Sequence, residues 1–378
     1  MENMVKYDLP FAKAYLANSD KKFAYDAINK GWGANSSNYI NLFEKAINKY
    51  LNCKYAIATS SCTGALHLAL KSLNIKKGDE VIIPDITWVA TAAAITYVNA
   101  SPVFAKVNKK TWCIDEDSIE KIITDKTKAI IVVHLYGNLA NLLKLKNIAK
   151  KYNLYLIEDA AESLGSELNG KKSGTFGDIG VFSFHGTKTI TTGEGGILVT
   201  NKKRIFNNAL ILSNHGRKAN KHNNWWMDEI GLKYKMSNVQ AAIGYGQILR
   251  ADNIVNKKRE IFFNYKKLLK NYNFQMNFEN KNQRNSFWLP VILYENLTES
   301  KRDKIISLAN NKGIGLRPFF YSLKRFKMFK NNKFIKYDNS FYKKGICLPS
   351  YHQLKLKEQK IIVKEILKLF SMFFKEFQ

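Results

Sequence analysis

Apolar positions between residues 40 and 250 alternate between helix-like and strand-like spacing. This spacing predicts helices at 41–50, 63–73, 89–98 and 142–152, and strands at 56–58, 80–83, 101–107, 129–134 and 154–157. Strands separated by helices of this length predict a mostly parallel sheet with helices on both faces. Ligands bind such sheets at the carboxyl ends of the strands. We therefore expect an α/β fold with its site along that edge.

The pattern changes beyond residue 250. Lys-rich helical stretches are predicted around short strands, the helices at 256–269, 300–311 and 355–374 and the strands at 287–293 and 315–317. The chain has 378 residues, about the length of two domains. We predict a large α/β domain over 1–250 and a smaller α+β domain over 251–378. The Asn- and Lys-rich tract at 265–285 is either an exposed connection or a set of solvated helix faces.

Composition narrows the class of protein. The formal net charge is +29, which fits a general Lys-rich bias or phosphate-bearing substrates. The basic residues do not gather on one element, which argues against nucleic acid. The four cysteines lack any C-x-x-C spacing, so we expect free thiols, no disulfide framework and no metal site. No apolar stretch is long enough to span a membrane, and we expect a soluble cytoplasmic protein.

Acidic residues follow directly after the predicted strand at 154–157. Asp159 and Glu162 would therefore lie at its carboxyl end, although an isolated acid there is more often a helix cap or an ion-pair partner. Further along, a short apolar strand leads to Lys188, which is surrounded by Gly, Ser and Thr. A lysine in such a setting can be desolvated, which lowers its pKa as Schiff-base chemistry requires.

A small-residue turn at 58–64 leads from a strand into a helix. Backbone N–H groups and hydroxyls at a helix N-terminus bind phosphate, although Ser and Thr are equally common there as simple caps. A phosphate cradle, a strand-end carboxylate and a downstream lysine are together the parts needed to hold a phosphorylated pyridine aldehyde. The combination is more specific than any one part.

These motifs resemble those of the DegT/DnrJ/EryC1/StrS family of pyridoxal 5′-phosphate (PLP)-dependent sugar aminotransferases, and within it the perosamine synthase type. The matching segments are Gly31–Trp32, Phe43–Glu44, Thr63, Gly78–Pro84, Thr87–Ala90, His134–Gly137, Glu158–Glu162, Gly177–Asp178, Phe182–Phe184, Lys188, Thr191–Gly196, Met236–Ala242, Arg317–Pro318 and Leu348–Ser350. The resemblance implies PLP fold type I, the aspartate aminotransferase-like fold.

The resemblance also implies roles for single residues. Lys188 would form the Schiff base with PLP and act as acid and base. Asp159 would pair with the pyridinium nitrogen, and Glu162 would contact the ring hydroxyl. Trp88 would stack on the ring, unless it is a core aromatic.

The cofactor phosphate would be bound by Thr63 and Ser183, with backbone N–H groups near Cys62 and Thr63. Family members are generally homodimers with interface sites, so the segment 233–238, which includes Asn238, would reach the partner's site. Arg317 and His134 are candidate contacts for substrate or partner, or structural residues.

Several positions depart from the family pattern. They are Ser37, Cys62, Lys106, Asn108 and Lys233. Ser37 and Lys233 lie near expected substrate or phosphate contacts and leave the substrate open. A branch of the family carries His in place of the Schiff-base lysine and dehydrates sugars, and Lys188 argues against that branch. His185 is expected to be a packed strand-end residue.

The expected reaction moves the amino group of L-glutamate onto a keto carbon of a nucleotide-linked 4-keto-6-deoxy sugar, for surface or capsular glycan synthesis. One alternative acceptor is a small phosphorylated ketone such as dihydroxyacetone phosphate. A PLP-dependent sugar dehydratase and a non-catalytic regulator are further alternatives.

Overall fold

A seven-stranded sheet forms the centre of the computed structural model, which describes residues 6–217, 227 and 229–377. Its strand order is β1 (Tyr55–Thr59), β9 (Gly196–Thr200), β8 (Ile179–Ser183), β5 (Tyr155–Asp159), β4 (Thr127–Val133), β2 (Glu80–Pro84) and β3 (Ser101–Ala105). Strands β8, β5, β4, β2 and β3 pair in parallel, whereas β9 runs antiparallel to β8 and β1. The predicted mostly parallel sheet is confirmed.

The antiparallel strand β9 was not expected, and it shapes the site. Because β8 and β9 are antiparallel neighbours, the loop between them turns back at the carboxyl end of β8. Lys188 lies in this loop. The loop therefore holds Lys188 at the edge of the sheet where β5 also ends.

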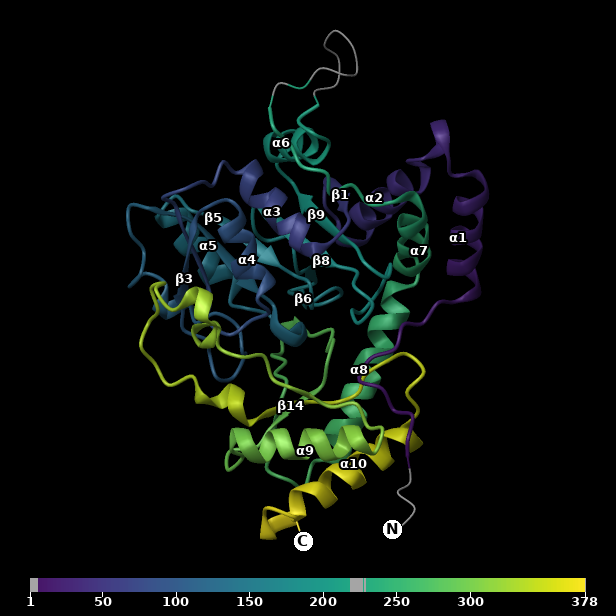
Figure 1. The fold of residues 1–378 in the computed structure, drawn as a ribbon, viewed down its shortest axis with the longest axis vertical. Helices are drawn as coiled ribbons and strands as arrows, with labels where there is room; N and C mark the ends of the chain where they lie inside the picture. Colours follow the sequence, from purple (N-terminus) through teal and green to yellow (C-terminus); the bar gives the residue numbers. More distant parts are fainter. Residues whose placement is uncertain (1–5, 218–226, 228, 378) are drawn as a thin grey trace.

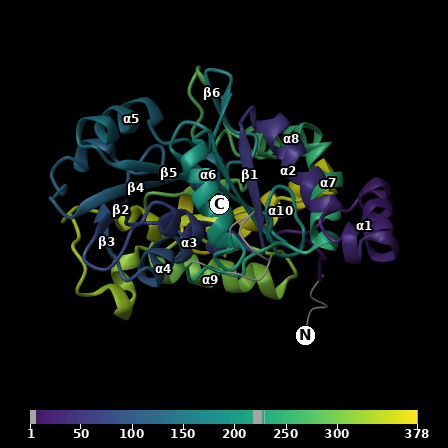
Figure 2. The ribbon, with the colours of Figure 1, turned by 90° about the horizontal axis from the view of Figure 1, so that it is seen from above.

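Helices cover both faces of the sheet, as the alternation predicted. One face packs against α3 (Cys62–Ser72), α4 (Ala90–Tyr97) and α6 (Lys203–Ser213). The other packs against α2 (Asn38–Leu51), α5 (Leu142–Lys151) and α7 (Asn238–Ile248). Successive side chains of a strand point to opposite faces, so Val81 and Ile83 join one core and Ile82 the other. The pattern had not predicted α1 (Asn18–Lys30), which packs on α7 at one end of the molecule (Figure 2).

A second sheet lies below the first in Figure 1, together with α9 (Glu299–Asn311) and α10 (Leu356–Ser371). Its strands are β10 (Gln275–Met276), β12 (Val291–Leu293), β14 (Gly345–Cys347) and β13 (Arg317–Pro318). Helix α8 (Ala251–Leu268) runs between the two parts, with Ile254 in a core of the large sheet and Ile261 in the core of the second. The domain boundary at 250/251 stays a prediction.

Smaller elements complete the described chain. A three-stranded sheet has the order β11 (Gln283–Arg284), β6 (Glu167–Leu168) and β7 (Lys171–Lys172). Short 3-10 helices are Gly33–Asn35, Glu116–Ser118, Leu135–Gly137, Leu323–Arg325, Lys327–Phe329, Ser340–Lys344 and Lys375–Phe377. Among the residues that the structure describes, no helix combines the length and apolar character needed to cross a bilayer.

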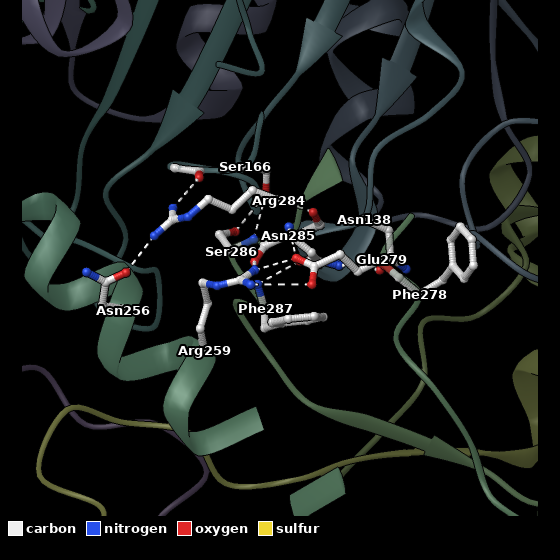
Figure 3. A network of polar contacts seen from close by, with 12 residues as sticks. Asn138, Ser166, Asn256, Arg259, Phe278, Glu279, Arg284, Asn285, Ser286 and Phe287 are labelled. Atoms are coloured by element: carbon white, nitrogen blue, oxygen red, sulfur yellow. Dashed lines mark hydrogen bonds and ion pairs between the residues drawn. The ribbon is translucent and has the colours of Figure 1, made fainter. Parts of the chain in front are cut away.

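The tract at 265–285 is exposed at its Lys residues and at most of its Asn residues, as predicted, but part of it is buried. Asn277 and Asn285 are buried, and a network of polar contacts joins this tract to α8 and to the large sheet's loops (Figure 3). Arg259 of α8 pairs with Glu279, and the Asn285 amide donates to Asn138 Oδ1 at 2.6 Å. Asn277 and Asn285 therefore satisfy buried polar groups, and composition does not distinguish them from the exposed Asn residues of the same tract.

Candidate active site

Lys188 lies in a tight loop after β8. The loop is closed by backbone hydrogen bonds from Lys188 N to His185 O at 2.9 Å and from Thr192 N to Phe184 O at 2.8 Å. The Lys188 side chain is 14% exposed, and its Nζ lies 3.1 Å from Glu162 Oε1. The lysine expected to carry the chemistry is therefore held, nearly buried, beside a carboxylate.

Asp159 is the last residue of β5 and is 5% exposed. Its Oδ2 accepts a hydrogen bond from Thr91 Oγ1 at 2.8 Å, and its Oδ1 accepts one from Ala161 N at 3.2 Å. Burial raises the pKa of Asp159 above its ordinary value, against the lowering effect of these bonds and of Lys188. A carboxylate fixed at both oxygens can accept a hydrogen bond from a protonated ring nitrogen without reorienting.

Glu162 follows three residues later and is also buried. Its Oε2 accepts a hydrogen bond from Tyr136 N at 2.8 Å, and its Oε1 faces Lys188. Burial raises the pKa of Glu162, and the Lys188 ammonium opposes this. The Glu162 carboxylate and the Lys188 amine can therefore share a proton between Oε1 and Nζ.

The N-terminus of α3 forms a second wall. Ser61 caps this helix by accepting a hydrogen bond from Gly64 N at 3.0 Å. A side chain at Gly196 of β9 would bring its Cβ to 2.5 Å from Cys62 N, so this glycine lets the turn lie directly against the sheet. The N–H groups of the first helical turn have no acceptors within the helix and suit an anionic group.

A cavity of about 550 Å³ joins these parts, within the range typical of small-molecule sites. Seven of the eight residues predicted to hold the cofactor line it: Cys62, Thr63, Trp88, Asp159, Glu162, Ser183 and Lys188. Trp88 is 59% exposed, so its interpretation as a core aromatic is wrong. The residues present fit PLP: an amine, a buried strand-end carboxylate, a helix N-terminus and an exposed indole border one space.

Asn238 does not line this cavity. Its side chain accepts a hydrogen bond from Tyr39 N at 2.9 Å and donates one to Gly31 O at 3.4 Å. The preceding segment contacts the chain's own β1 and the turn after it, through a β-bridge between Thr59 and Lys235 and a hydrogen bond from Ser60 N to Tyr234 O at 2.6 Å. A cofactor contact by Asn238 in a partner's site stays a prediction.

The other candidate residues divide clearly. Arg317 and His185 line the cavity, and the His185 side chain is 49% exposed rather than packed as expected. His134 is fully buried, and its Nε2 lies 3.0 Å from Glu158 Oε2. Of the two roles left open for His134, the structure supports the structural one, because its side chain lies in the core and does not border the cavity. None of the departing positions except Cys62 borders the cavity; the others are Ser37, Lys106, Asn108 and Lys233.

Three residues with a part in the site were given no individual role in the sequence analysis. Thr91 holds Asp159, while Tyr136 and Trp288 build an aromatic wall beside Lys188. Thr91 lies in the first turn of α4, directly after the matched segment Thr87–Ala90, and this position could have indicated it. Trp288 is a hundred residues from Lys188 in sequence, and no local pattern points to it.

The fold and the site define a PLP-dependent enzyme with the aspartate aminotransferase-like fold. The model of the DegT/DnrJ/EryC1/StrS aminotransferase family matches residues 15–367, and the chain belongs to this family. It is thus an aminotransferase, and PLP is its cofactor.

Named relatives cover nearly the whole chain. GDP-perosamine synthase of Escherichia coli O157:H7 is 39% identical over 97% of this chain and 100% of its own. GDP-perosamine synthase of Vibrio cholerae is 37% identical over 91% and 94%.

Among solved structures, Helicobacter pylori PseC, an aminotransferase involved in the biosynthesis of pseudoaminic acid, has a TM-score of 0.89. It is 28% identical and covers 97% of this chain and 100% of its own. The PLP form of Streptococcus pneumoniae Spr1654 has a TM-score of 0.87 and is 25% identical, over 97% and 99%.

Proposed function

We propose that this enzyme transfers the amino group of L-glutamate to the keto carbon of a nucleotide-linked 4-keto-6-deoxy sugar. The observation that carries the proposal is Lys188 Nζ beside the Glu162 carboxylate, in a cavity that Asp159 and the α3 N-terminus also border. The sugar acceptor is supported by the two GDP-perosamine synthases, which align with nearly the whole chain. GDP-linked sugars are therefore the first acceptors to test.

The residues divide the work by position. PLP, when bound, supplies an electron sink that lets an amino group and a keto oxygen be exchanged. Lys188 would hold the cofactor covalently and, when free of it, would carry a proton on Nζ. Asp159 would keep the ring nitrogen protonated. Glu162 would orient the Lys188 amine and accept from the ring hydroxyl.

The remaining predicted contacts hold and cover the cofactor. Thr63 and Ser183, with the N–H groups of Cys62 and Thr63, would bind the phosphate. Trp88 would lie against one face of the ring. We also propose a homodimer with a second copy beside the cavity and Asn238 near the shared site, as the family resemblance implies.

We place the activity in the cytoplasm and in surface or capsular glycan synthesis. The four cysteines are free thiols, as expected in a reducing compartment. A UDP-linked amino sugar transaminase of Campylobacter jejuni, 33% identical over 85% of this chain, also supports an acceptor of this class.

The test follows the visible absorbance of the PLP-loaded protein. L-Glutamate should bleach the band, and one keto acceptor should restore it. GDP- and UDP-linked 4-keto-6-deoxy sugars are compared with dihydroxyacetone phosphate. If only dihydroxyacetone phosphate restores the band, the amino acceptor is a small phosphorylated ketone and not a nucleotide-linked sugar. Release of a dehydrated sugar without amino transfer would favour the dehydratase alternative.

Variants test the assignment of Lys188. Lys188→Ala should lose covalent attachment of PLP, measured as a borohydride-stable mass on the peptide that contains residue 188. Lys171→Ala, on the exposed strand β7, serves as the control and should behave as wild type. A borohydride-stable adduct or turnover in Lys188→Ala contradicts the assignment.

A further inference from the structure

Trp288 contacts the Lys188 loop at two points. Its indole Nε1 donates a hydrogen bond to Thr187 O at 2.8 Å, which fixes the residue just before the lysine. Its ring centre lies 3.8 Å from Lys188 Nζ. Trp288 is 4% exposed, so water does not compete for either contact. A single side chain from the second part of the molecule thus holds both the backbone and the amine.

The backbone of Trp288 is itself fixed from behind. Its carbonyl accepts a hydrogen bond from the buried Lys258 ammonium at 3.3 Å. The residues before it belong to the network in Figure 3, where Ser286 N donates to Ser166 Oγ at 2.9 Å. In the same network Asn285 accepts a hydrogen bond from Phe287 N at 2.6 Å. The position of the indole is therefore fixed by hydrogen bonds that join its backbone and the preceding residues to α8 and to the loops of the large sheet.

The lysine amine lies between two groups. Glu162 Oε1 lies 3.1 Å from Nζ, and the Trp288 ring face supplies a second attractive surface. The ring is supported in turn by Tyr136, which stacks with it at 6.1 Å and 14°. A lysine side chain has four flexible bonds, so two contacts at its tip remove most of its alternative positions.

We propose that Trp288 is a positioning residue that aims the Lys188 amine at the cofactor aldehyde. This inference rests on the proposed role of Lys188. Reactions at a carbonyl carbon depend steeply on the position of the attacking atom, so a lysine free to swing would react more slowly. The proposal concerns geometry and not charge, because an aromatic face favours the ammonium form, which is not the nucleophile.

Matched variants separate position from packing. Trp288→Leu removes the ring face and the N–H donor, whereas Trp288→Phe keeps a ring face and loses the donor. Trp112 provides the control: it is fully buried in the same aromatic cluster, contacts Tyr136, and its Nε1 has no partner among the described residues. Trp112→Leu and Trp112→Phe therefore disturb the cluster without touching Lys188.

Two measurements on the apo-protein make the test. The first is the rate at which the visible band grows after PLP is added, as Lys188 nitrogen bonds to the aldehyde carbon and one water leaves. The second is the dissociation constant of pyridoxamine 5′-phosphate, which fills the same cavity without bonding to Lys188. We expect Trp288→Leu to slow attachment roughly tenfold and Trp288→Phe about threefold, with pyridoxamine 5′-phosphate affinity unchanged. The Trp112 variants should match wild type in rate.

Each other outcome overturns the inference. Attachment as fast as wild type, or faster, means that the ring does not aim the amine. An equal loss of pyridoxamine 5′-phosphate affinity means that Trp288 only shapes the cavity. If Trp288→Leu does not fold, the test rests on Trp288→Phe. A wild-type rate of PLP attachment in that variant means that the hydrogen bond to Thr187 O does not position the lysine, and the inference fails. These outcomes differ from failure of the Lys188 assignment, which would appear as attachment in Lys188→Ala.

Discussion

Lys258 of α8 is a buried cation whose stability effect can be measured. Its Nζ donates to Trp288 O, to Ser350 O at 2.6 Å and to Ser350 Oγ at 3.3 Å, all uncharged oxygens. Burial lowers the pKa of Lys258 from its ordinary 10.5 to about 7. The folded protein therefore holds this proton less tightly than the unfolded chain does.

The sign of the pH effect follows from the direction of that shift. Between pH 7 and pH 10.5 the unfolded chain binds more protons at Lys258, so its contribution to the free energy of unfolding rises with pH. Below pH 7 both states are protonated and the cost of burying the charge is complete. The difference of 10.5 and 7 corresponds to about 5 kcal/mol over the whole window.

Lys258→Met tests this reasoning in urea unfolding of the apo-protein between pH 6 and pH 9. The free energy of unfolding of wild type minus that of the variant should rise by about 2 kcal/mol from pH 7 to pH 9, because Lys258 is already half deprotonated at pH 7 in the folded protein and other titrations cancel in the difference. Lys267→Met, exposed on the same helix, should give a difference that does not change with pH. A constant difference for Lys258→Met across this range would refute the buried-cation argument.

Two substitutions test the cofactor site directly. Thr91→Val removes the hydrogen bond to Asp159 Oδ2 and should weaken PLP binding about tenfold, with Thr91→Ser close to wild type, as measured by equilibrium titration. Equal affinities for the two variants would mean that this hydroxyl does not hold the carboxylate. Gly196→Ala would force Cys62 N away from β9 and should weaken PLP roughly tenfold or more while sparing pyridoxal, which lacks the phosphate. Equal losses for the two ligands would argue against a phosphate cradle there.

Local patterns predicted most of the large sheet because each strand and helix there buries one clear face. The predicted helix at 63–73 is α3, and the predicted strand at 80–83 is β2, each within one residue at either end. The strand-end position of Asp159 followed from the same periodicity. Helix α1 was missed because it packs mainly on α7, and its outer face leaves Tyr25 and Ile28 exposed.

Local hydrophobic patterns could not predict contacts between residues that are far apart in the sequence. The burial of Asn277 and Asn285 depends on partners in loops more than a hundred residues away. The sequence left His134 open between a contact for substrate or partner and a structural residue, and its buried partner Glu158 holds it in the core. Whether a strand-end side chain points to the cavity or to the core is decided by the face of the strand and by what packs there.

By itself the sequence determined the α/β order, the cofactor class and the residues whose chemistry is local: Lys188 in its small-residue loop, Asp159 at a strand end and the turn before α3. Only the tertiary structure decided what surrounds Lys188. Trp288 meets the lysine loop, with Lys258 behind it, because α8 and the second sheet fold back against the strand ends, whereas Tyr136 follows β4, the neighbour of β5. The physical reason is that hydrophobic spacing specifies which face of an element is buried, whereas the partner that buries it is chosen by packing of the whole chain.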